Sequence, residues 1–135
     1  MPLDVSLDSE LDAVVIRATG VVSSAELQLA VGDVLILAGF EPGMNQLFDV
    51  SEGGLDLDAS NLRELAEFFQ APGVRKRLGT GYKLAIVAGR AVDFGVARMY
   101  EVFNTEDAIS IQVFYTLKDA RIWLREPRGP SSTRA

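Results

Sequence analysis

Acidic side chains between Asp56 and Glu67 stand at intervals that match part of a calcium-binding loop. Asp56, Asp58 and Ser60 would occupy its first, third and fifth positions. The sixth position needs glycine for a sharp turn, but it is Asn61 in this chain. Asp58 or Ser60 can instead cap a helix, because leucines recur at helical spacing through the supposed loop. We therefore expect the start of a helix here and no metal site.

Other residue types that carry catalysis or bind cofactors are scarce. The 135 residues include no cysteine and no histidine, which excludes disulfides, thiolate nucleophiles, Ser-His-Asp triads and nearly every transition-metal site. Lysine or carboxylate chemistry remains open, but Lys83 stands in no recognisable catalytic motif. The glycines that begin at Gly89 lack the spacing of a nucleotide-binding loop. The sequence thus predicts a protein that is not an enzyme and has no cofactor.

Composition and charge are those of a globular domain. Hydrophobic residues make up 48% of the sequence and charged residues 24%, which suits one domain with a buried core. The formal net charge is −6, so we expect no nucleic-acid partner. The longest apolar stretch, Leu27–Phe40, is interrupted by polar residues and is too short to span a membrane. The first residues lack the features of a signal peptide, and we expect a cytoplasmic protein.

Strands and helices alternate along the sequence after an initial strand pair. The expected strands are Leu3–Asp8, Val14–Thr19, Asn45–Val50, Leu84–Ala88 and Ile109–Tyr115. The expected helices are Ser23–Ala38, one that begins at Asp58 or Ser60 and ends at Pro72, Asp93–Asn104 and Leu117–Leu124. This ββαβαβαβα order predicts an α/β domain over residues 1–125, with a single mixed, mostly parallel sheet, an antiparallel N-terminal hairpin and about four helices. Residues 126–135 are expected to form a disordered tail.

The first expected helix is apolar on nearly all sides. Val31 and Val34 belong to its core stripe, while Leu29 and Ile36 lie on the opposite side and Leu37 between the two. A helix that is apolar all round is covered all round, and in a chain this short the second cover would be another subunit or a ligand. Scattered surface leucines are the alternative. We predict a homo-oligomer, a dimer, with Leu29, Ile36 and Leu37 in its interface.

A cleft for a ligand or partner is expected beyond the carboxyl ends of the parallel strands, where neighbouring connections diverge. Unpaired backbone N–H groups, apolar side chains and arginines would meet there, and they suit an amphiphile with an anionic head or the acidic loop of a protein partner. Alternatively, Arg98 pairs with Glu101 or Glu106 and the cleft holds water. The predicted cleft residues are Asp49, Ser51, Leu55, Arg90, Phe94 and Arg98.

Several segments, taken in order, resemble a known family. They are Thr19–Ser23 after the hairpin, Phe48–Ser51, Phe94–Glu101, and Val113-Phe114 followed by Asp119–Leu124. Over residues 3–125 they look like the SpoIIAA-like branch of the STAS (sulphate transporter and anti-sigma factor antagonist) superfamily of small bacterial proteins. The resemblance implies a sheet flanked by helices and a fold similar to the lipid-binding CRAL-TRIO domain. It favours a non-catalytic regulatory or protein-interaction domain, with a small-molecule- or lipid-binding module as the alternative.

The same resemblance bears on Ser60. Anti-sigma factor antagonists of the superfamily carry an Asp-Ser-Ser-Gly motif whose second serine is phosphorylated by a partner kinase. The matching stretch here is Asp58-Ala59-Ser60-Asn61, so Ser60 would be the phosphoacceptor, although the first serine and the glycine are missing. A phosphate suits a helix N-terminus, but Asp56 and Asp58 would repel it. The alternative is that Ser60 serves only as a capping hydroxyl.

Overall fold

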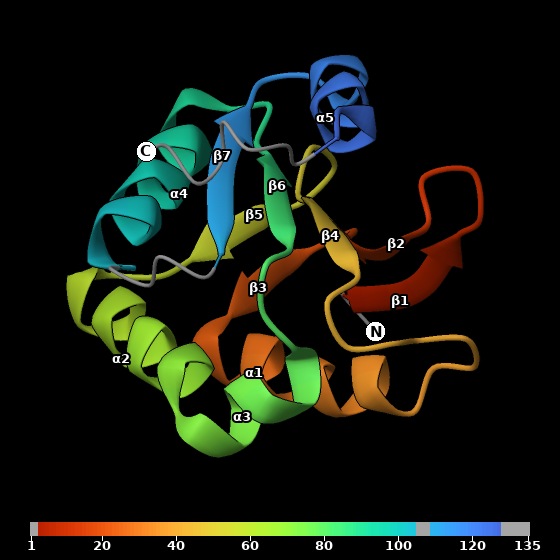
Figure 1. The fold of residues 1–135 in the computed structure, drawn as a ribbon. Helices are drawn as coiled ribbons and strands as arrows, with labels where there is room; N and C mark the ends of the chain where they lie inside the picture. The colour runs from red at the N-terminus through yellow and green to blue at the C-terminus, as the bar shows by residue number, and fades with distance from the viewer. Residues whose placement is uncertain (1–2, 105–108, 128–135) are drawn as a thin grey trace, which may run out of the picture.

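The computed structural model describes residues 3–104 and 109–127 (Figure 1). The strands are β1 (Leu3–Asp8), β2 (Ala13–Ala18), β3 (Val21–Ser23), β4 (Asn45–Asp49), β5 (Gly54–Asp56), β6 (Lys83–Val87) and β7 (Ser110–Phe114). The helices are α1 (Ser24–Leu35), α2 (Ala59–Gln70), α3 (Pro72–Leu78), α4 (Ala91–Phe103) and α5 (Leu117–Arg125). The predicted order is confirmed, and the short elements β3, β5 and α3 are added to it. The expected tail lies outside the described residues, apart from Glu126 and Pro127.

Five strands form one mixed sheet in the order β1-β2-β4-β6-β7. The hairpin strands β1 and β2 are antiparallel, whereas β2, β4, β6 and β7 run parallel to one another. The strands β3 and β5 form a separate two-stranded parallel sheet. The predicted fold class, an α/β domain with a mostly parallel sheet and an antiparallel N-terminal hairpin, is therefore confirmed.

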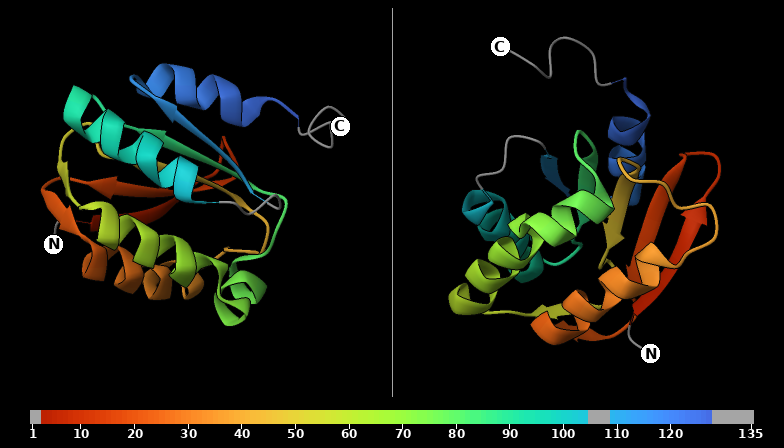
Figure 2. Two further views of the ribbon diagram at one scale, coloured as in Figure 1. Left: turned by 90° about the vertical axis from the view of Figure 1, so that its left-hand side faces the viewer. Right: turned by 60° about the horizontal axis from the view of Figure 1, so that its bottom comes forward.

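The helices cover the two faces of the sheet unequally. The helix α5 packs on one face against β4, β6 and β7, while α1, α2 and α4 form a layer on the other (Figure 2). The strand β6 lies inside the sheet between β4 and β7 and is covered on both sides, as the apolar run Leu84–Ala88 predicts. Among the described residues, no helix combines the length and apolar character that crossing a bilayer requires.

Local sequence signals explain where the helices begin. The Ser23 hydroxyl accepts from the backbone N–H of Glu26, and the Glu26 carboxylate accepts from the backbone N–H of Ser23, which completes a capping box. The helix α1 ends at Leu35, earlier than predicted. Pro72 begins α3 directly after α2 because proline fits the first turn of a helix. The residue that caps α4 is Arg90, and Asp93 lies buried in its first turn.

Candidate functional site

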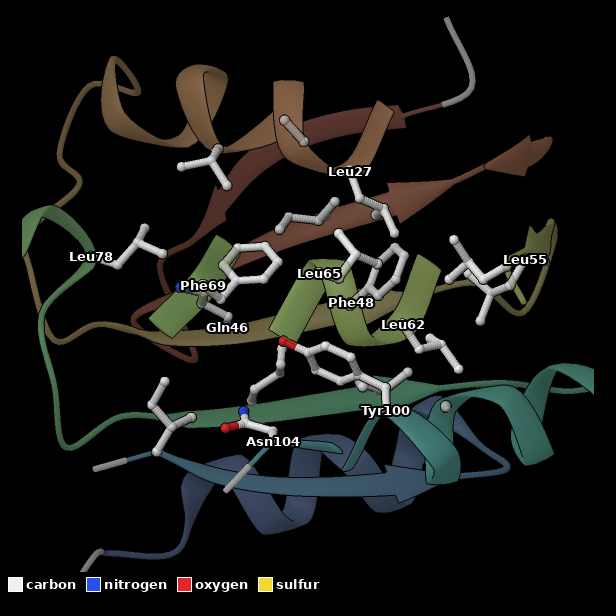
Figure 3. A pocket seen from close by; sticks show the side chains of 18 of the residues that line it. Leu27, Gln46, Phe48, Leu55, Leu62, Leu65, Phe69, Leu78, Tyr100 and Asn104 are labelled. Atoms are coloured by element: carbon white, nitrogen blue, oxygen red, sulfur yellow. The ribbon is translucent and has the colours of Figure 1, made fainter. Parts of the chain in front are cut away.

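An internal cavity that is partly open to solvent lies between the sheet and the layer formed by α1, α2 and α4 (Figure 3). The space open to the centre of a water-sized sphere is about 90 Å³. Sheet side chains line one side of this cavity and helix side chains the other. Its walls are mostly aliphatic and aromatic, and include Leu27, Phe48, Leu62, Leu65, Phe69 and Ile86.

The alternation of side chains along each strand determines what reaches the cavity. On β4, Gln46 and Phe48 line the cavity, whereas Leu47 packs in the core beneath α5. The strand β6 repeats the pattern, with Leu84 and Ile86 lining the cavity. A polar residue at one of these alternate positions therefore has its side chain next to an apolar space.

Gln46 is such a residue. It is 7% exposed, and its Nε2 atom has no hydrogen-bond partner in the described part of the chain. The residues paired with it on the neighbouring strands are Val14 and Leu84, whose side chains offer no acceptor. Leaving a buried amide donor unpaired costs about 1–3 kcal/mol. Gln46 Nε2 is therefore a buried donor that no group in the described part of the chain satisfies.

Two tyrosines also line the cavity. Burial raises the pKa of Tyr82 to about 12. Burial likewise raises the pKa of Tyr100, and the nearby Tyr82 phenol adds to that rise. The Tyr100 ring enters the cavity from α4, close to Asn104 at the end of the same helix (Figure 3). Both phenols are neutral at ordinary pH. They therefore give the cavity polar groups but no charge.

The carboxyl ends of β2 and β4 form a second, shallow hollow of about 350 Å³. Ser51 and Arg90 of the predicted cleft line it, together with the glycines Gly53 and Gly54. The backbone N–H groups of these glycines donate to the carbonyl oxygens of Val50 (3.1 Å) and Gly20 (3.2 Å). These two donors are therefore already used within the chain.

Polar groups beside this hollow pair with one another. The buried Asp49 carboxylate accepts from the backbone N–H (2.9 Å) and the hydroxyl (2.6 Å) of Ser51. The Arg90 Nε donates to Asp93 Oδ2 at 2.8 Å, and this contact raises the pKa of Arg90. Asp93, which is 1% exposed, also accepts from the backbone N–H of Leu55 at 3.1 Å. This network fastens β5 to the first turn of α4.

The other predicted cleft residues lie outside the polar hollow. Leu55 lines the internal cavity. Phe94 stacks on Tyr115, with ring centroids 3.9 Å apart. Arg98 is exposed and lies 3.6 Å from a carboxylate oxygen of Glu101. The structure therefore places Asp49, Ser51 and Arg90 at the polar hollow and Leu55 at the apolar cavity. Phe94 packs against the core and Tyr115, and Arg98 lies on the exposed side of α4.

Ser60 lies exposed in the first turn of α2. The N-cap is Asp58, whose side chain accepts from the backbone N–H of Asn61 at 2.8 Å, so the capping role considered for Ser60 belongs to Asp58. The Asn61 side chain accepts in return from the backbone N–H of Asp58. Phosphorylation of Ser60 stays a prediction.

The residues of the predicted subunit interface differ in exposure. Leu29 is 74% and Ile36 83% exposed on α1 and just after it. Leu37 is half-buried and packs against the core cluster that contains Val31 and Val34. A second subunit could therefore cover Leu29 and Ile36 directly, while Leu37 already has cover within the chain.

Lys83, the lysine considered for catalysis, is buried on the α5 side of the sheet. Its Nζ donates to the carbonyl oxygens of Trp123 and Glu126, both at 2.6 Å. These bonds hold the end of α5 and give Lys83 a structural role.

Sequence reasoning missed Gln46, Tyr82 and Tyr100 as site residues. The signal for Gln46 was its position two residues before Phe48 in an expected strand, which places both side chains on one face. The tyrosines enter the cavity through contacts between elements distant in sequence, and no local pattern marks them.

Comparisons with known proteins complete the description. No family model matches the sequence, and no curated protein is significantly similar to it. Among solved structures, the chain is similar to an uncharacterised protein of the DUF3478 family from Shewanella loihica, described as having a SpoIIAA-like fold. The TM-score is 0.52 at 18% sequence identity, and the alignment covers 90% of this chain and 91% of that one. The sheet order and this likeness together show that the chain has a SpoIIAA-like fold.

Proposed function

We propose that this chain is a non-catalytic, STAS-type binding domain whose internal cavity holds a small apolar molecule. The observation that carries the proposal is the apolar cavity beneath α1, α2 and α4, which has Gln46, Tyr82 and Tyr100 among its lining residues. Binding sites for small molecules are concave and mostly apolar, with a few polar groups that orient the ligand. The Gln46 amide and the Tyr82 and Tyr100 hydroxyls are such groups.

The walls of the cavity would supply the affinity for such a molecule. Apolar ligand surface buried against side chains such as Leu27, Phe48 and Leu65 contributes about 25 cal/mol per Å².

The cavity volume limits the size of the occupant. An engineered protein cavity of about 150 Å³ accepts benzene, so a space of about 90 Å³ suits a molecule of single-ring size or smaller. Only part of a long acyl chain would fit in this space. The proposal therefore favours a small ring or a short-chain molecule over a phospholipid.

Two measurements test the proposal. Native mass spectrometry of protein purified from its own host should detect a retained small molecule. Benzene added to ligand-free protein should raise the midpoint of thermal unfolding in a saturable manner, because a ligand that binds only the folded state stabilises it. The proposal fails if benzene has no such effect.

Variants that fill the cavity test whether benzene binds there. Ala97 is buried on α4 and lines the cavity, so Ala97→Leu should fill part of the space and abolish the effect of benzene. Ala30→Leu on α1 is a second such variant. The matched control is Ala91→Leu at the exposed start of α4, which should respond to benzene like the wild type. Equal responses in all of these proteins would place the binding elsewhere.

The exposed pair Leu29 and Ile36 favours a second candidate function, a regulatory or protein-interaction domain. Large apolar side chains exposed on one helix are typical of interaction surfaces when they form a contiguous patch. Such a role is compatible with ligand binding, since α1 carries these residues outward and contributes Leu27 to the cavity. The test is the oligomeric state of the wild type compared with that of a variant changed at Leu29 and Ile36.

A further inference from the structure

The internal cavity is long in the direction of the strands. Alternate residues of the stretch 82–86 line it along β6, and four residues at about 3.3 Å each extend over about 13 Å. On α4 the lining residues lie within 96–104, a stretch of about 12 Å at about 1.5 Å per residue. Figure 3 shows the same extent, with Leu78 at one end of the cavity and Leu55 at the other.

The volume of the cavity is small for this length. The space open to the centre of a water-sized sphere is about 90 Å³. Divided over a length of about 12 Å, it has a mean cross-section of about 7.5 Å². A branched or globular molecule needs its volume in one place, whereas an extended chain distributes its volume along the whole length. The shape of the cavity therefore favours an extended chain.

The walls favour a hydrocarbon chain. Phe48 and Ile86 line the cavity from the sheet, and Leu65 lines it from α2. Among the residues that the structure describes, no Lys, Arg, Asp or Glu lines it. An ionised group inside the cavity would therefore be buried without an opposite charge, which is unfavourable.

We infer that the cavity binds an unbranched alkyl chain of about six carbons, which lies along the strands beneath α1, α2 and α4. The chain length follows from the volume, which suits about as many carbon atoms as a single ring contains. This inference rests on the proposed function and names the ligand class of the same site.

A pair of isomeric probes tests the preference for an unbranched chain. 1-Hexanol and 3,3-dimethylbutan-1-ol contain the same atoms and the same hydroxyl group, but the main chain of the branched isomer is two carbons shorter. Each methylene group that becomes buried in an apolar site improves binding by about fourfold. We therefore expect 1-hexanol to bind about tenfold more tightly than its isomer, as measured by NMR titration.

A series of primary alcohols tests the length limit. From 1-butanol to 1-hexanol, the dissociation constant should fall by about fourfold for each added methylene group. From 1-hexanol to 1-octanol it should change little, because the cavity is full and the added carbons extend into solvent.

Variants at one end of the cavity should move this limit. Leu55→Ala removes a lining side chain there, so 1-octanol should bind about tenfold more tightly than 1-hexanol to this variant. Leu57→Ala, at the next lining position along the chain, is a second variant with the same expected result. The matched control is Leu29→Ala on the exposed side of α1, which should keep the limit of the wild type. Circular dichroism shows whether each variant is folded.

The outcomes separate this inference from the proposed function. If benzene and both isomeric alcohols bind, but the two alcohols bind equally well, the cavity binds ligands without selecting an unbranched chain, and the inference is overturned alone. An unchanged length limit in folded Leu55→Ala and Leu57→Ala would also overturn it. If neither benzene nor any of the alcohols binds the wild type, both proposals fail together.

Discussion

The Lys83 ammonium lies 5.0 Å from the centre of the Trp123 ring and donates to the carbonyl oxygen of the same residue at 2.6 Å. It donates at the same distance to the carbonyl oxygen of Glu126, the C-cap of α5. A lysine from β6 thus binds two carbonyl groups at the end of α5, of which that of Trp123 also accepts from the backbone N–H of Glu126 at 3.2 Å. Its positive charge also suits the negative end of the helix dipole. One buried side chain thereby fixes α5 to the sheet.

Replacement of Lys83 should therefore loosen α5. We expect Lys83→Met to lower the free energy of unfolding by about 2 kcal/mol, because charge-assisted hydrogen bonds to two carbonyl groups are lost. Urea denaturation followed by the fluorescence of Trp123, the single tryptophan of the sequence, measures this change. The control is Lys118→Met at an exposed position of α5. Equal stability of the two variants would show that Lys83 does not hold the helix.

Replacement of Gln46 should change the free energy of unfolding in the opposite direction to replacement of Lys83. In the absence of ligand, we expect Gln46→Met to raise the free energy of unfolding by about 1 kcal/mol, because an unpaired buried donor is removed at nearly constant volume. Thermal unfolding of the ligand-free protein should show a midpoint several degrees higher. A lower midpoint would mean that the amide is satisfied in the folded protein.

Acid should weaken the ionic contacts that join the first hairpin to α5. The pKa of Asp8 lies below its ordinary value of 3.8, first because its carboxylate accepts from the backbone N–H of Leu11 and second because it accepts from Arg121. Because the folded-state pKa is lowered, this stabilisation is present above pH 3.8 and is lost as the pH falls through the folded-state value.

The variant Asp8→Asn tests this dependence. It should be less stable than the wild type at neutral pH, and the difference should shrink as the pH falls below 3.8. Asp4→Asn, an exposed change on the same strand, provides the control. Urea denaturation at a series of pH values measures the difference, and a gap that stays constant with pH would contradict the role of Asp8.

The predicted subunit interface can be tested on α1. Leu29→Glu combined with Ile36→Lys should give a folded protein of smaller apparent mass, because both side chains are exposed within a single chain. Light scattering measures the mass, and circular dichroism confirms that the variant is folded. A wild type that is monomeric at high micromolar concentration would refute the dimer.

Local patterns allowed much of the fold to be predicted. The Ser23–Glu26 capping box located the start of α1, and the apolar run Leu84–Ala88 indicated a strand covered on both faces. The three-residue strands β3 and β5 were missed because so few residues show no periodicity. Asp93 was expected to begin a helix, whereas α4 begins at Ala91 and the Asp93 carboxylate accepts from the backbone N–H of Leu55, a residue 38 positions away.

The candidate site was less predictable than the fold. The rule that ligands bind beyond the carboxyl ends of parallel strands led to Ser51 and Arg90, and the structure places both beside a shallow hollow. The internal cavity instead depends on how α2 and α4 pack over β4, which is set by contacts between distant segments. Periodicity alone predicts which face a residue occupies but not whether the opposing helices fill the space above it.

Methyl NMR of the ligand-free protein titrated with benzene tests the central claim most directly, since the ring current of bound benzene shifts nearby methyl signals. The account predicts saturable shifts for Leu62, Leu65 and Ile86, which line the cavity, and none for Leu29 and Ile36, which point to solvent. Shifts confined to the exposed methyl groups, or no saturable shift at any methyl group, would contradict a ligand-binding cavity.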